Sequence, residues 1–437
     1  MVVDSTPVTI IGTLIQGYSV QRQVTFKSGY IETSRESLCA RCRGFMGLCG
    51  KKVCPILIKA KTFIDLKALS RDEIAGSAPP GVFIGSYGYP KVLAGPLIPP
   101  VSGDTMHMDS EAWLGDSFDR ILQNRFQLVR SKSVMDIHSA SDPEGMLEKI
   151  QGMVLSDRPV DTEASFEKKP DTRVSFSMRE APTGPSADLK AFTVVDNPSV
   201  PRKVDRIVSD TDYRAAPGIA ELYDSGISQR QITRLLSVGL LGVKPNRKLV
   251  PTAWSVTAVD DIIGKAIADR VRYHPTIDQY LVFRAEALAN NVVVLLMPTS
   301  WMFEGLELWH ASAPNFKCDS DFELYEGRKE YASNIAGAYY AARAPVLGYL
   351  DRIGRQAGAI VFMEVKNEWI PLGVWRFREL TKEALTGTPQ TFDTLGIAIA
   401  AISRLLYSPI KPWLAASSLY RYLRQQRKLT DFFSGSE

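Results

Sequence analysis

Four of the five cysteines in this 437-residue sequence fall in one short segment, at Cys39, Cys42, Cys49 and Cys54. Four thiolates suit a tetrahedral Zn²⁺, and a two-residue spacer lets one turn present two sulfurs to the same ion. An iron–sulfur cluster is the alternative, because Cys54 precedes Pro55 as in ferredoxin-type runs, but the earlier spacers do not follow that pattern. The spacing therefore predicts a zinc module over residues 39–54.

The same segment is basic, and no acidic residue occurs from residue 39 to residue 64. A zinc module that only stabilises its own loop does not need this charge, whereas contact with phosphates uses it. The basic residues that we assign to a nucleic-acid surface here are Arg41, Arg43, Lys51 and Lys52. A solvated cationic face is the alternative.

Residues 218–241 have the pattern of a helix-turn-helix, with Gly226 in a short turn between two helical segments. Arg230 and Arg234 are expected to share the exposed face of the second helix, beside glutamines able to reach base edges. The basic residues assigned to this second nucleic-acid surface are Arg230, Arg234, Lys244, Arg247 and Lys248. The alternative is an ordinary helical hairpin inside a larger fold.

Near the last residues, Gln426 and Leu429 precede the adjacent aromatics Phe432 and Phe433. Adjacent exposed aromatic side chains are costly unless a partner buries them. One 3₁₀ turn places Leu429 and Phe432 on one face with Phe433 beside them, which makes a hydrophobic plug. This arrangement resembles the peptide that binds the sliding clamp PCNA, so residues 423–437 are predicted to be a flexible clamp-binding tail. A terminal helix packed on the body is the alternative.

Two further groups of residues are candidates for metal-dependent chemistry. Asp104, His107 and Asp109 could hold a divalent cation, although a polar loop before an acid-rich helix start is the favoured explanation. Glu364 and Lys366 on an expected strand are similar to the Glu-x-Lys of metal-dependent nucleases, but no partnering aspartate strand is evident.

Glu304 and Glu307 follow an expected strand and lie near two tryptophans and His310. We expect these side chains to line a pocket, but the sequence does not assign a role to either glutamate.

The elements that must position these residues mix helices and strands without a strict β–α–β order. Helices are expected within 111–129, 142–155, 217–271, 331–352, 394–406 and 412–425, and strands at 280–283, 292–297, 360–365 and 369–375. This pattern predicts an α+β fold of mixed sheet and helices in two lobes. The expected domains are 1–275, which contains the zinc module, and an α+β domain over 276–422, followed by the tail.

The composition is that of a folded protein, with 45% hydrophobic and 23% charged residues. The apolar runs are far shorter than the roughly 18 residues that a membrane span requires, and no signal peptide is recognised. The expected location is therefore the cytoplasm, in association with the nucleoid. Because the net charge is only +4, any nucleic-acid surface must come from local patches.

The cysteine segment and the tail together resemble the Nre family of archaeal DNA-repair proteins. The stretches 48–57, 80–96, 235–261, 337–350 and 370–375 also resemble that family, so the likeness covers nearly the whole chain. The resemblance implies a four-cysteine zinc motif, a clamp-binding C-terminus and a role in DNA-damage repair.

Two classes of function remain open at this point. The first is a repair protein that binds DNA, docks on PCNA and assembles with other repair proteins. The second is a clamp-tethered, metal-dependent enzyme that acts on damaged nucleic acid, for which the sequence assigns no catalytic residue.

Overall fold

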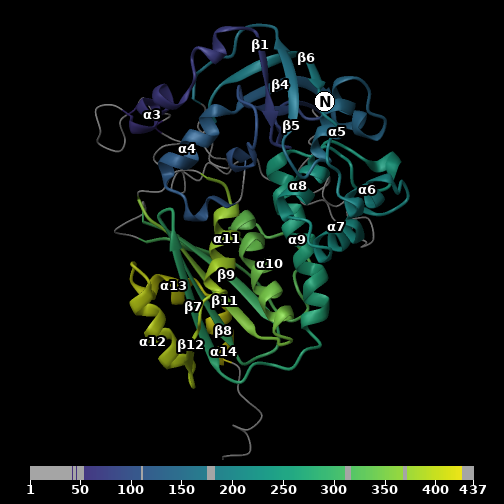
Figure 1. Cartoon of the computed structure of the whole chain (residues 1–437). Coiled ribbons are helices and arrows are strands. Elements are labelled where there is room, and N and C mark those ends of the chain that lie inside the picture. Colours follow the sequence, from purple (N-terminus) through teal and green to yellow (C-terminus); the bar gives the residue numbers. More distant parts are fainter. Residues whose placement is uncertain are drawn as a thin grey trace, which may run out of the picture. The chain divides into compact units, whose positions relative to one another are not determined.

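The computed structural model describes Cys42, Met46 and residues 54–109, 112–174, 183–310, 316–367 and 372–425 (Figure 1). Most of the predicted zinc module and the clamp peptide lie outside these ranges. The predicted site residues that lie outside them are Cys39, Arg41, Arg43, Cys49, Lys51, Lys52, Gln426, Leu429, Phe432 and Phe433. The described chain divides into two compact units, one up to Ile263 with Leu372 and Gly373, the other from Gly264 onward.

A six-stranded mixed sheet forms the first unit. Its order is β1 (Glu73–Ala78), β5 (Val160–Phe166), β6 (Ser186–Val194), β4 (Val129–Asp136), β3 (Lys91–Ile98) and β2 (Val82–Ile84). Neighbouring strands run antiparallel except β4 and β6, which are parallel. The mixed directions agree with an α+β fold.

Seven helices accompany this sheet in the described part of the chain. They are α3 (Pro55–Phe63), α4 (Phe118–Gln127), α5 (Met146–Val154), α6 (Arg202–Ser209), α7 (Ala215–Asp224), α8 (Gln229–Ser237) and α9 (Thr252–Val271). Ser228 begins α8, because its side chain accepts a hydrogen bond from the backbone N–H of Gln231. Helix α9 carries the chain from the first unit into the second.

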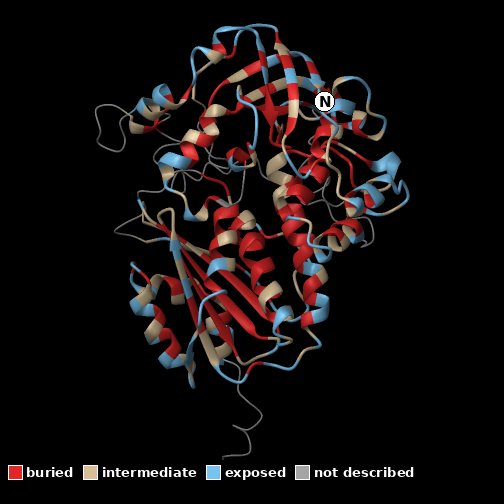
Figure 2. Ribbon diagram, viewed as in Figure 1, coloured by how far each residue is buried: buried red, intermediate tan, exposed pale blue. Residues whose placement is uncertain are grey.

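The second unit is also built on a six-stranded mixed sheet. Its order is β10 (Cys318–Glu323), β9 (Met302–Trp309), β11 (Gly358–Val365), β8 (Asn290–Met297), β7 (Tyr280–Ala287) and β12 (Gln390–Phe392). Every residue of β8 and β11 is buried (Figure 2), and residues 292–297 and 359–363 within them form continuous apolar runs in the sequence.

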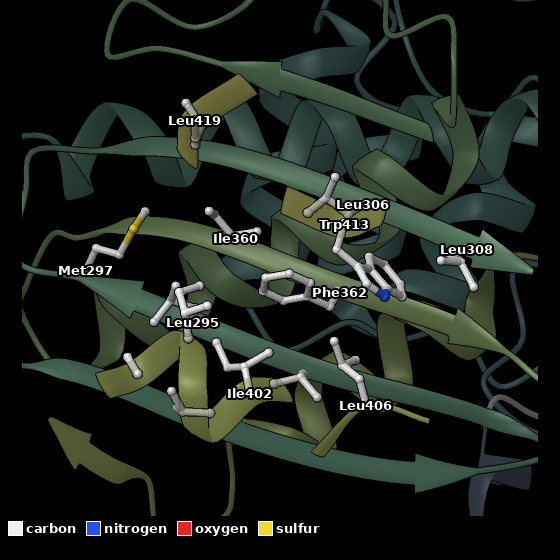
Figure 3. Close-up of a cluster of buried hydrophobic side chains, with 14 of the residues drawn as sticks. Leu295, Met297, Leu306, Leu308, Ile360, Phe362, Ile402, Leu406, Trp413 and Leu419 are labelled. Carbon is white, nitrogen blue, oxygen red and sulfur yellow. The ribbon is translucent and has the colours of Figure 1, made fainter. Parts of the chain in front are cut away.

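Helices cover both faces of this second sheet. On one face, α10 (Ala336–Arg352) approaches Gly305 of β9, with the Cα of Tyr339 near the point where a Cβ would stand. On the other face, α12 (Leu395–Leu405), α13 (Ile410–Ala416) and α14 (Ser418–Gln425) bury a hydrophobic cluster against the strands (Figure 3). This cluster includes Leu306, Phe362 and Trp413. Helix α11 (Trp375–Ala384) contacts α10 and β8.

The two mixed sheets and their helices confirm the predicted α+β class. A strand was expected over residues 369–375. This prediction is wrong at the end of the range, because Trp375 begins helix α11. The buried residues Trp375, Phe377, Leu380 and Ala384 follow a helical repeat there. The single helix expected over 412–425 is two helices that break at Ser417.

Candidate functional sites

A buried carboxylate in the first unit gathers three arginines. Asp109 lies at the end of a short 3₁₀ helix and is 3% exposed. Arg234 donates to its Oδ2 at 2.7 Å and to its backbone carbonyl at 2.9 Å. Arg125 donates to Oδ1 at 3.2 Å, and Arg230 pairs with the same oxygen. Burial alone raises the pKa of Asp109, but the three guanidinium groups outweigh it and hold the pKa far below its ordinary value.

This cluster corrects the expectation that Arg230 and Arg234 share an exposed face. Arg234 is 7% exposed, and the glutamines expected to reach base edges, Gln229 and Gln231, are buried as well. Gln229 donates to Asp260 at 3.1 Å, and Gln231 donates to two backbone carbonyls. Residues 231–237 are all buried, so α8 cannot enter a DNA groove as the recognition helix of a helix-turn-helix does. The two helices and the glycine turn are as expected, but they form an internal hairpin.

The other basic residues assigned to this surface differ in their surroundings. Arg247 is buried, and its guanidinium donates to the carbonyls of Val208 and Gly242 at 2.8 Å each. The Arg247 side chain therefore holds the backbone segments around it together. This corrects the assignment of Arg247 to a nucleic-acid surface. Lys244 is exposed and Lys248 is half-buried, so these two can still reach a ligand.

The possible cation site at residues 104–109 is not assembled as the spacing suggested. Asp104 is exposed and its carboxylate accepts from the backbone N–H of Met106, while the Asp109 carboxylate is held by arginines. Within the described ranges, no group of three or more His, Cys, Asp and Glu side chains is placed to hold a metal ion. Cys42 is buried and Cys54 is half-buried directly before α3, but Cys39 and Cys49, which are predicted to bind the same ion, lie outside these ranges.

The Glu-x-Lys pair of β11 has a different environment at each residue. Glu364 is fully buried, and its carboxylate accepts from Asn291 at 3.0 Å and from the backbone N–H of Tyr407 and Ser408 at 2.9 and 2.6 Å. His310 Nε2 lies 2.9 Å from the same carboxylate. These contacts hold the loop between α12 and α13 against the sheet.

Lys366 lies on the rim of this network. Its ammonium pairs with Glu286 and lies 3.7 Å from the centre of the Tyr407 ring. The carboxylate of Glu364 and the ammonium of Lys366 therefore bind different partners. The contacts that the structure shows for both residues connect strands and loops of the second unit.

The hydrogen bonds to Glu364 predict a pH-dependent stability. Burial alone raises its pKa, but the donors from Ser408, Tyr407, Asn291 and His310 outweigh it and lower the pKa below the ordinary 4.5. An acid whose pKa is lower in the folded state stabilises the fold above its unfolded pKa, and this stabilisation is lost as the pH falls. Thermal and urea unfolding should therefore show Glu364→Gln less stable by about 1–3 kcal/mol at pH 7, since a buried network is left mismatched. The difference should shrink below pH 4.5.

The matched control is Glu383→Gln on the exposed face of α11. A surface substitution of this kind should change stability by less than about 0.5 kcal/mol at either pH. An equal cost of Glu364→Gln at pH 7 and pH 4 would show that the ionised carboxylate does not stabilise the fold.

Glu304 and Glu307 point to opposite faces of β9 and do not line one pocket. The Glu304 carboxylate is fully buried and accepts from the Ser417 hydroxyl and from the backbone N–H of Ser418 and Leu419 at 2.7 and 3.1 Å. Burial raises the pKa of Glu304, and these hydrogen bonds oppose the shift only in part. Glu304 thus caps the first turn of α14.

Glu307 lies near Arg376 instead, at 4.0 Å. Arg376 also donates to Asn290 at 2.9 Å, and burial lowers its pKa to about 10. Two glutamates that are three residues apart on a strand necessarily face opposite sides, because side chains alternate. The opposite orientation of the two glutamates could therefore have been predicted from the sequence.

Two family models match the chain and together span most of it. The model described as archaeal Nre, N-terminal, matches residues 48–314, and the model described as archaeal Nre, C-terminal, matches residues 323–432. The chain belongs to the archaeal Nre family.

Individual Nre proteins are similar over almost their entire length. DNA repair protein NreB of Archaeoglobus fulgidus is 36% identical over 401 residues, which cover 90% of this chain and 99% of NreB. DNA repair protein NreA of the same organism is 34% identical and covers 90% of this chain, with 98% of NreA matched. NreA of Haloferax volcanii is 32% identical, over 86% of this chain and 93% of that NreA.

No solved structure matches the Nre chain. In the part of the chain that the structure describes, no helix has the length and apolar character needed to cross a membrane. The family models and the relatives confirm the predicted membership of the Nre family.

Proposed function

We propose that this Nre protein acts in DNA repair and docks on the sliding clamp PCNA through its C-terminal peptide. The observation that carries the proposal is the match to relatives named DNA repair proteins over 90% of the chain. The clamp peptide comprises Gln426, Leu429, Phe432 and Phe433.

The structure supports a role for the tail as a docking element in one respect. Helix α14 is described as far as Gln425 and is held to the sheet by Glu304 and by the buried side chain of Leu419. The proposed peptide begins with the next residue, Gln426, so it starts from a fixed point on the second unit.

Titration of a synthetic peptide of residues 423–437 into purified clamp tests the proposal. Burial of Leu429, Phe432 and Phe433 removes apolar surface at about 25 cal/mol/Å², and ordering a flexible peptide consumes part of that gain. We expect a low-micromolar affinity, roughly −7 to −8 kcal/mol. Absence of heat and of competition with another clamp ligand would mean that the tail does not dock.

We further propose that Cys39, Cys42, Cys49 and Cys54 bind one Zn²⁺ per chain. Elemental analysis of the purified protein should find zinc at that ratio, and Cys42→Ser should lower the zinc content and loosen the N-terminal region, because metal binding contributes to folding there. Cys318→Ser, which removes the cysteine of β10, is the control and should leave the metal content unchanged. An iron-containing preparation would contradict the zinc assignment.

Contact with DNA is proposed for the basic cysteine segment, with Arg41, Arg43, Lys51 and Lys52, and for the exposed Lys244 and the half-buried Lys248. The burial of Arg234 and Arg247 removes them from this surface. We propose that binding is electrostatic and weakens as the salt concentration rises.

A further inference from the structure

The base of the tail is fixed, so the partner of the tail must also approach α14. The carboxylate of Glu304 holds the first turn of α14, and Leu419 anchors the helix in the hydrophobic cluster of the second sheet. Gln426 directly follows Gln425, the last residue of α14 that the structure describes. A clamp that takes the peptide from Gln426 onward therefore comes within reach of the helices beside it.

The surface of these helices is strongly biased in charge. From residue 394 to residue 425 the sequence contains no aspartate and no glutamate. The basic side chains of the segment are Arg404 on α12, Lys411 on α13, and Arg421 and Arg424 on α14, and all four residues are exposed. We call this segment, residues 394–425, the acid-free layer.

Three large apolar side chains are exposed on the same layer. Ile397 of α12 is 55% exposed, Tyr407 between α12 and α13 is 53% exposed, and Tyr422 of α14 is 38% exposed. The inward faces of the three helices are already buried against the sheet (Figure 3), so these side chains are not part of that core. Exposed tyrosine and arginine together are typical of protein interfaces more than of surfaces that bind only phosphates.

The acidic group of a neighbouring strand does not cancel this charge. Glu286 of β7 accepts from the Tyr407 hydroxyl at 2.7 Å, but it also pairs with Lys366 and with Arg284. Two cations thus match one carboxylate at that edge, so Glu286 does not offset the basic side chains of the acid-free layer.

We infer that the acid-free layer is a second docking surface for the sliding clamp, one that contacts an acidic protein surface beside the pocket that takes the tail. This inference rests on the proposed clamp docking of the tail and extends it. The tail inserts its apolar plug, and α14 with its neighbours adds electrostatic attraction and a fixed orientation of the second unit on the clamp.

The test compares the full chain with the isolated peptide of residues 426–437, which contains no residue of the acid-free layer, in binding to purified clamp. The full chain should bind roughly tenfold or more tightly at low salt, and the advantage should fall as salt screens the charges. Arg421→Glu with Arg424→Glu in the full chain should abolish the advantage. Lys329→Glu with Arg352→Glu makes the same change of charge outside the acid-free layer and should preserve it.

The outcomes separate the two proposals. If the peptide binds but the full chain binds no more tightly, or the α14 variant binds as the wild type does, the second surface is overturned while tail docking stands. If the peptide fails to bind, the proposed clamp docking itself fails.

DNA affinity and thermal stability of the α14 variant are measured alongside clamp binding. If the α14 variant loses affinity for DNA but not for the clamp, the layer is a nucleic-acid surface and the inference is overturned. Should the α14 variant melt at a lower temperature, Arg421→Gln with Arg424→Gln replaces it, and this milder pair should still lose a measurable part of the advantage.

Discussion

Replacement of Asp109 by alanine is expected to destabilise the first unit by about 3–5 kcal/mol, the cost of leaving buried charge without its counter-charge. Three arginines converge on this carboxylate, and Arg234 is almost fully buried. Without Asp109 their guanidinium groups lose a shared acceptor in a place that water reaches poorly. Thermal unfolding, together with hydrogen exchange of β2 and α8, should report the loss.

The matched control is Asp119→Ala. Asp119 also forms an ion pair with a basic residue of the first unit, Lys59, but both side chains are more than a third exposed. Solvent screens such pairs, so the control should cost less than about 1 kcal/mol. Similar costs for the two variants would show that the Asp109 cluster stabilises the fold no more than a surface ion pair does.

Replacement of both Phe432 and Phe433 by alanine in the full chain is expected to abolish detectable association with the clamp. Paired aromatic side chains in one pocket act as hot spots, and their loss should cost several kcal/mol of binding free energy. A low-micromolar complex cannot lose that much and still be detected. Surface plasmon resonance or calorimetry measures the effect.

Gln426→Ala is the graded control for this pair. It removes one hydrogen bond and little apolar area, so it should cost only roughly 1 kcal/mol. Because the tail lies beyond α14, thermal unfolding of the double phenylalanine variant should match that of the wild type. Undiminished binding by that variant would remove the tail from the clamp interface.

The local sequence pattern predicted the helices and strands that are marked by an apolar run, a capping residue or a glycine turn. The buried strands β8 and β11 were recognisable as apolar runs, and Thr394 marks the start of α12 because its hydroxyl accepts from the N–H of Ile397. The helical hairpin of α7 and α8 was found from its glycine turn, since Gly226 adopts a positive φ of 83° that favours glycine.

Partners that are distant in sequence could not be predicted in the same way. Arg230 and Arg234 meet Asp109 across 121 and 125 residues, and Glu304 meets Leu419 across 115. A polar stripe on a helix looks the same in sequence whether it faces water or a buried carboxylate. The predicted exposure of the two arginines was therefore wrong, although the helix that carries them was predicted correctly.

The order of strands in the second sheet has a consequence for how this unit forms during synthesis. β8 and β9 follow one another closely in the chain, yet β11 lies between them and pairs with both. Until residue 365 has left the ribosome, β8 and β9 each carry an unpaired apolar edge open to other chains. A fragment that stops before residue 358 should therefore aggregate, and only a chain that includes β11 can close the sheet.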